Sequence, residues 1–256
     1  MLEPLLYILV GVIASLLGSM VGLGGGSIAV PALYCFGVGI EHAVASSKFM
    51  VLVTSAVSTY RYSKKLRIPL KLYSIIALPM ILTSYLGAYL VVVVPSNLLT
   101  IIVGLVLLAA AIRAIVESGA GRRVIEEYES KRNYLLGALS GFVAGIVAGI
   151  TGLGGGVVNV PMFLYVLSLP AHSAVSLSMA CILPAALSST IRHVIDGIIL
   201  WKAALPLSVG AILGAWFGPK IALKLSRRKL RKFIGIILAA VVLRMIIQAI
   251  LTLNAF

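Results

Sequence analysis

The glycine run Gly22–Gly26 reads GLGGG and is followed by Val30-Pro31, and the same pattern returns 130 residues later. There, Gly152–Gly156 is followed by Val160-Pro161. Each run lies inside an apolar stretch, where glycine disfavours a continuous helix. Helices interrupted at matching points in the two halves of a membrane protein are the best sequence indication of a transport site.

The composition is that of a membrane protein. Of the 256 residues, 61% are hydrophobic and 11% are charged, and the mean hydropathy is +1.14. A soluble domain carries about 25% charged residues, so this chain lacks the polar surface that a soluble fold needs. The apolar stretches follow one another without the strict alternation that is typical of a transmembrane β-barrel. The sequence therefore predicts an all-α, polytopic membrane protein.

The net charge of +14, from 21 basic and 7 acidic residues, at first suggests a nucleic-acid partner. We do not expect one, because the basic residues lie in short loops between apolar segments, as membrane topology requires. Cys35 and Cys181 lie in apolar segments and are interpreted as small core residues. The start of the chain, Met1 to Pro4, has no basic region, so we expect no cleaved signal peptide.

Five apolar elements are expected in each half. They span 5–22, 27–39, 43–61, 70–94 and 97–116 in the first half, and 134–151, 157–169, 173–192, 199–221 and 231–253 in the second. We accordingly divide the chain into a first transmembrane repeat (1–116), a cytoplasmic linker (117–133) and a second repeat (134–256). The second element of each half is shorter than the roughly 20 residues needed to span a bilayer. It is either a half-helix or one arm of a re-entrant hairpin.

Loop charge predicts that the two repeats are inverted. One basic cluster, residues 61–71, follows the third element of the first half, and another, residues 220–232, follows the fourth element of the second half. The positive-inside rule places both clusters in the cytoplasm. They share a side only if the two halves have opposite orientations, and both chain termini then lie outside.

The glycine runs predict an anion site. Glycines let the main chain unwind, and the element that follows each run presents free N–H groups and a positive dipole end. Two such breaks facing each other near the membrane midplane would cradle an anion. We expect the substrate-binding residues to be Gly24, Gly25, Gly26, Ser27, Gly154, Gly155, Gly156, Asn159, Lys48, Ser46 and Ser176.

Three charged or titratable positions need separate mention. Lys48 lies about one turn into a predicted span, where a cation is costly without a partner. It either pairs with an anionic substrate or extends to the outer interface. His42 and His172 recur at matching positions and are candidate proton-relay groups, although turn or cap roles are the plainer interpretation.

Other interpretations of the glycine runs are weaker. Helix packing needs regularly spaced glycines, such as Gly210, Gly214 and Gly218, rather than consecutive ones. A dinucleotide loop would need a βαβ context, and the potassium-filter similarity at Thr151 fails in the first half, which has Val21 there. No metal-ligand spacing, nucleophile elbow or Walker loop occurs, so we expect no metal, no cofactor and no enzymatic activity. No acidic residue falls in the middle of a predicted span, which favours an anion as cargo.

At the repeated Gly-x-Gly-Gly-Gly with a following proline, the chain resembles the TauE/SafE family of sulfite exporters. The resemblance covers both motifs, Gly22 to Pro31 and Gly152 to Pro161, and nearly the whole length. It implies a transporter of sulfite, sulfonates or related sulfur anions.

The leading hypothesis is therefore a secondary transporter of small sulfur oxyanions that works by alternating access and exports its substrate. We expect it in the plasma membrane of a prokaryote, with the substrate anion and the lipid bilayer as partners. The sequence leaves a homodimer open, as it does the identity of the anion and of any coupling ion. The rival hypotheses are an anion channel, and a membrane scaffold in which the glycines serve packing alone.

Overall fold

The computed structural model describes residues 2–116 and 131–224. Within them the chain forms α1 (Leu2–Val21), α2 (Gly26–Cys35), α3 (Ile40–Ser63), α4 (Leu70–Val93), α5 (Ser96–Val116), α6 (Lys131–Thr151), α7 (Gly156–Pro161) continued by the π-helical turn η1 (Met162–Val166), α8 (Ala171–Ile195) and α9 (Trp201–Ala222). The all-helical prediction is confirmed for these residues. The predicted element 231–253 lies outside them, as does the linker up to residue 130, whereas residues 131–133 already belong to α6.

Five of the described helices are long and apolar enough to cross a membrane: α1, α4, α6, α8 and α9. Large apolar side chains such as Leu5, Leu82 and Leu213 are more than half exposed on α1, α4 and α9. Exposed apolar surface on this scale suits contact with lipid chains. The chain is a multi-pass membrane protein.

The two short elements are arms of re-entrant hairpins. Ten residues of α2 are about 15 Å long, half of a hydrocarbon core of about 30 Å. The chain reverses after α1, because the ring of Phe36, just after α2, lies 6.1 Å from the ring of Tyr7 near the start of α1. In the second half, Asn159 of α7 accepts a hydrogen bond from Ser140 of α6, so α7 also runs back along the helix before it.

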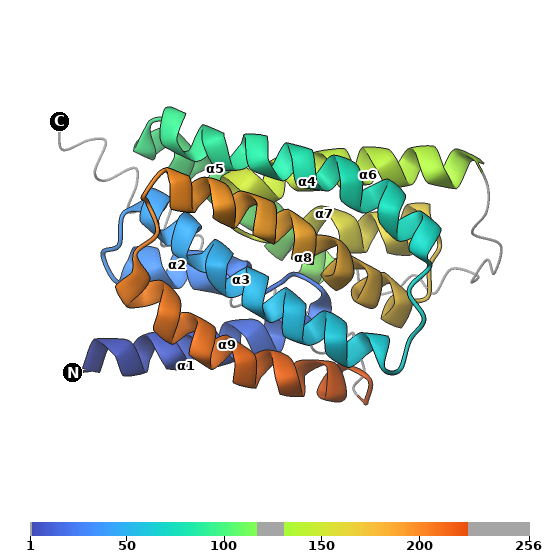
Figure 1. Cartoon of the computed structure of the whole chain (residues 1–256), viewed down its shortest axis with the longest axis horizontal. Coiled ribbons are helices and arrows are strands. Elements are labelled where there is room, and N and C mark those ends of the chain that lie inside the picture. Colours follow the sequence, from blue (N-terminus) through green and yellow to red (C-terminus); the bar gives the residue numbers. More distant parts are fainter. Residues whose placement is uncertain (1, 117–130, 225–256) are drawn as a thin grey trace.

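Helices α3 and α8 lie side by side at the centre and run antiparallel (Figure 1). The start of α3 adjoins the residues after α8, because His42 Nδ1 lies 2.8 Å from the Ile198 oxygen. The Leu200 amide also donates to the Ser46 hydroxyl at 3.0 Å. Since α3 and α8 are the third elements of their halves, this direction supports inverted repeats, which we retain as our interpretation.

The outer helices pair across the two halves, α1 with α9 and α4 with α6. A Cβ on Gly210 or Gly214 of α9 would overlap the carbonyl of Ile8 or Val12 in α1. Glycines in α6 pack in the same way against α4; a Cβ on Gly149 would lie 2.5 Å from the Ser84 oxygen. Small residues let helix backbones approach closely in membranes, so these regularly spaced glycines serve packing within one chain.

We expect the Gly210→Ala substitution to lower the apparent melting temperature of the purified protein. The added methyl has no room against the Ile8 carbonyl, and overpacking costs about 1–3 kcal/mol. Leu213→Ala on the exposed face of α9 is the matched control, with little expected change. Equal melting temperatures for Gly210→Ala and the wild type in a thermal denaturation assay would contradict this packing.

Candidate functional site

Both glycine runs interrupt the helices as predicted. α1 ends at Val21 and α2 begins at Gly26. Between them, Gly22, Gly24 and Gly25 adopt φ angles of 83°, 82° and 87°. Other L-residues rarely adopt such angles, which is why the reversal requires glycine.

The second break has the same conformation. α6 ends at Thr151 and α7 begins at Gly156. The φ angles of Gly152, Gly154 and Gly155 are 71°, 85° and 81°. The repeated sequence therefore encodes a repeated backbone shape.

The two breaks pack directly against each other. A Cβ on Gly26 would overlap the Gly152 carbonyl, and a Cβ on Gly156 would overlap the Gly22 carbonyl. The contacts are reciprocal, with each helix start abutting the other break. Only hydrogen at these Cα positions allows the main chains to come this close.

The breaks lie midway along the central helices. A Cβ on either Gly24 or Gly154 would be within 4 Å of Val51 and of Ile182. Val51 is near the middle of α3, and Ile182 is near the middle of α8. The junction is therefore deep inside the bundle, away from both of its ends.

Several main-chain N–H groups at the junction have no hydrogen-bond acceptor among the described residues. In the first break these belong to Gly25, Gly26 and Ser27. In the second break they belong to Gly154, Gly155, Gly156 and Val157. Buried N–H groups are almost always paired, so this concentration of free donors favours an anionic or polar ligand.

The two halves differ at one carbonyl. In the first half the Gly18 oxygen accepts from the amides of Gly22, Leu23 and Gly24 at 2.9, 2.8 and 3.3 Å. The matching oxygen in the second half belongs to Ala148. It accepts from the Gly152 amide at 3.1 Å and from Lys48 Nζ at 2.6 Å.

In the second break, the Lys48 ammonium thus bonds to the carbonyl oxygen whose counterpart in the first break accepts two further amides. The hydrogen bonding of the second break differs as a result. The Leu153 amide turns to the Thr151 hydroxyl, 3.4 Å away, and the Gly154 amide is left free. The Lys48 side chain is 0% exposed. It points into the bundle at α6 rather than out to the membrane interface, so of the two alternatives only pairing with an anionic substrate is kept, as a prediction.

The predicted polar residues separate into two groups. The hydroxyls of Ser27 and Ser176 are buried and have no hydrogen-bond partner, so both remain available. Ser46 instead bonds to Leu200 beyond α8. Asn159 is bonded to Ser140 and to the sulfur of Met80, 3.4 Å away, so it holds α7 to α6 and α4.

The candidate relay histidines lie at opposite ends of the bundle. His42 is exposed in the first turn of α3, where it meets the Ile198 oxygen. His172 is in the first turn of α8, which runs antiparallel to α3. The two side chains are not brought together, although each one's role as a proton carrier is still a prediction.

Sequence reasoning missed two serines at the breaks. The Ser178 hydroxyl, at the α8 position that matches Lys48, donates to the Gly22 carbonyl at 2.8 Å. A Cβ on Gly152 would lie 2.7 Å from the Ser47 hydroxyl oxygen. The 130-residue offset that pairs Lys48 with Ser178 was the available signal.

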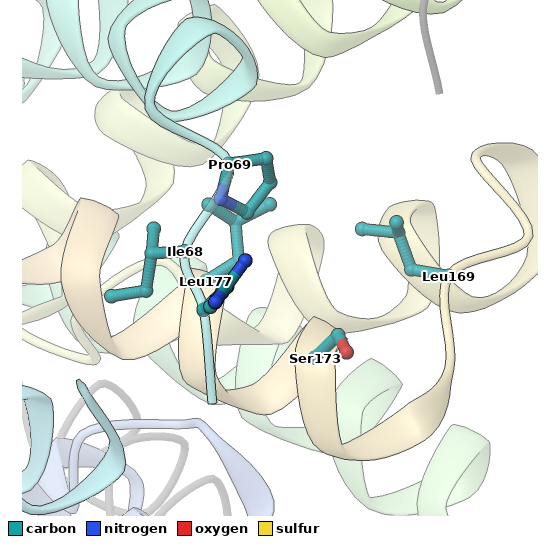
Figure 2. A pocket seen from close by; sticks show the side chains of 6 residues that line it. Ile68, Pro69, Leu169, Ser173 and Leu177 are labelled. Carbon is teal, nitrogen blue, oxygen red and sulfur yellow. The ribbon is translucent and has the colours of Figure 1, made fainter. Parts of the chain in front are cut away.

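A cavity of about 360 Å³ opens at the end of the bundle where the α3–α4 and α7–α8 loops meet. Figure 2 shows its lining, with Ile68, Pro69 and Leu177 grouped together in the view and Ser173 and Leu169 to their right. Arg67 supplies a charge to its lining. Leu177 directly precedes Ser178, whose hydroxyl bonds to the first break.

We call this end of the bundle the Arg67 end, and the end where α3 meets the α8–α9 loop the His42 end. At the His42 end, His42 Nδ1 meets the Ile198 oxygen and the Leu200 amide donates to the Ser46 hydroxyl, which joins α3 to that loop. The described residues thus show a cavity at the Arg67 end and hydrogen bonds between α3 and the α8–α9 loop at the His42 end.

Comparison with known proteins agrees with this architecture. The family model for sulfite exporter TauE/SafE matches residues 7–245. The probable membrane transporter protein MJ0441 of Methanocaldococcus jannaschii is 30% identical over 263 residues, covering 96% of each chain. The probable membrane transporter protein YunE of Bacillus subtilis is 26% identical over 260 residues, covering 93% of this chain and 94% of its own. No solved structure matches. The chain belongs to the TauE/SafE sulfite exporter family of membrane transporters.

Proposed function

We propose that this protein is a secondary carrier of small sulfur oxyanions, either sulfite or organosulfonates, and that it works by alternating access. The observation that carries the proposal is the junction of the two breaks, where unpaired N–H groups gather beside the buried ammonium of Lys48. Amide donors and a cation favour negative charge. The family assignment adds the sulfur oxyanion as the substrate class.

The orientation follows from the basic residues. Arg61, near the end of α3, lies over the Trp216 ring of α9 at 4.5 Å, so the C-terminal parts of α3 and α9 share the Arg67 end. The positive-inside rule makes this the cytoplasmic end. We propose the plasma membrane of a prokaryote as the host membrane, since the relatives reported above come from prokaryotes.

We prefer alternating access to an open channel, and the features of the two ends are compatible with it. The cytoplasmic Arg67 end has a cavity, while hydrogen bonds join α3 to the α8–α9 loop at the His42 end. Carriers of this kind expose a fixed central site to one side at a time. The shape corresponds to a state that admits an anion from the cytoplasm.

The membrane potential gives the direction. Moving one charge through 100 mV is worth about 2.3 kcal/mol. A cell that is negative inside therefore expels an anion without a coupling ion, and export is the simplest cycle.

In proteoliposomes loaded with sulfite, we expect efflux that accelerates when a potassium–valinomycin potential makes the interior negative. The measurement is the initial rate with sulfite, a sulfonate and thiosulfate in separate preparations. If none of the three moves faster than in protein-free liposomes, the substrate assignment is wrong. Single-channel currents in planar bilayers would favour the anion channel instead.

Lys48→Met should reduce the efflux rate by about tenfold or more, because charge-assisted hydrogen bonds are worth roughly 1.5–3 kcal/mol. Lys202→Met, which removes an exposed lysine in the first turn of α9, is the matched control. A scaffold function predicts no flux in either protein. Bulky substitutions at Gly25 or Gly155 discriminate less well, since both glycines abut main-chain carbonyls and the fold itself would be disturbed.

Arg67→Gln should raise the KM for efflux from the cytoplasmic side by a few-fold at low ionic strength. The exposed guanidinium at the cavity concentrates anions there, and salt screens it over about 8 Å at physiological ionic strength. Lys65→Gln changes the same charge in the same loop outside the cavity lining and should have a smaller effect. If neither substitution changes the KM, the cavity is not part of the transport route.

A further inference from the structure

Near the C-terminal end of α8, two buried polar side chains have no partner in the described part of the chain. His193 is 0% exposed, and neither of its ring nitrogens has a hydrogen bond. Thr190 is 5% exposed, and its hydroxyl has none either. Residues three apart share a helix face. An imidazole and a hydroxyl therefore adjoin each other with unused hydrogen-bonding capacity, which is costly in a buried setting.

Lys48 approaches the same region from α3. Its ammonium is bonded to Ala148 of α6. At that level α6 packs on α4, whose Ser84 hydroxyl lies 2.8 Å from that of Ser189 on α8. His193 follows Ser189 by one helical turn on the same face of α8, so this chain of contacts connects Lys48 to the region of His193.

The charge of Lys48 is not balanced by a carboxylate of residues 2–116 or 131–224. Glu3 lies at the start of α1 and Glu41 at the start of α3. Asp196 is paired with Arg192 at 2.7 Å. A buried cation inside a membrane protein requires a partner, and a carbonyl alone supplies no charge. The arrangement therefore calls for an anion.

We propose that Lys48, Thr190 and His193 form a binding site for a small oxyanion. A neutral imidazole offers one N–H donor, the hydroxyl a second, and the ammonium two beyond its bond to Ala148. The proposal rests on the proposed function and deepens it, since the ligand is the transported sulfur oxyanion. It also assigns substrate binding to His193, whereas the sequence pointed to His42 and His172 as candidate proton relays.

The proposed site lies next to the His42 end of the bundle. The His193 carbonyl accepts from the Ile198 amide at 3.3 Å, and Ile198 in turn meets His42. An anion held by His193 would lie between the glycine junction and these ties. Movement of the α8–α9 loop would then open the site outward.

The test is calorimetric titration of the purified full-length protein with sulfite. His193→Leu should weaken binding by about tenfold or more, given the strength of hydrogen bonds to charged groups. His193→Gln, which keeps a donor, should lose less, and Thr190→Val should lose a few-fold. Ser58→Ala is the matched control, because Ser58 is also buried without a partner but lies far along α3 from Lys48.

Sulfite binding by His193→Leu with wild-type affinity would overturn the inference. The imidazole would then be a core side chain that water satisfies, and its removal should leave the melting temperature unchanged or higher. If His193→Leu does not fold, the affinities of His193→Gln and Thr190→Val for sulfite are used instead. Wild-type affinity in both variants would then overturn the inference. If the wild-type protein binds no sulfite, sulfonate or thiosulfate, the proposed function is overturned as well. If the wild type binds sulfite and the variants bind it with the same affinity, only this inference is overturned.

Discussion

The structure depends on the need to hide interrupted main chain from lipid. A break in a helix exposes N–H and C=O groups that hydrocarbon cannot satisfy. Here the two breaks cover each other, with Gly26 against Gly152 and Gly156 against Gly22. The re-entrant hairpins bring the breaks inward, and the central helices α3 and α8 enclose them. This one arrangement therefore shields the main chain from lipid and also gathers its free N–H groups in one place.

The two breaks have the same backbone conformation but differ in their hydrogen bonds. Lys48 reaches Ala148, whereas its counterpart Ser178 bonds to Gly22. The first break keeps more of its amides satisfied, while the second has more of them free beside a cation. For the anion that we propose, the second break therefore offers more free donors than the first.

The two ends of the bundle give the junction a direction. Hydrogen bonds from α3 to the α8–α9 loop tie the His42 end, and a cavity with Arg67 in its lining opens at the other end. In the proposed carrier, the central site would be reached from each end in turn. Lys48 belongs to the junction through its hydrogen bond to Ala148.

The sequence by itself determined the all-helical membrane fold and the two breaks, because hydropathy and consecutive glycines act locally. It also predicted the element bounds within a few residues in the described chain, and it singled out Lys48. The tertiary structure decided where Lys48 points and that Ser46 and Asn159 are occupied elsewhere. It also separated His42 from His172, and left His193 buried without a partner. These outcomes depend on which helices pack together and in which direction, and contacts between distant residues, such as Lys48 and Ala148, leave no local pattern in the chain.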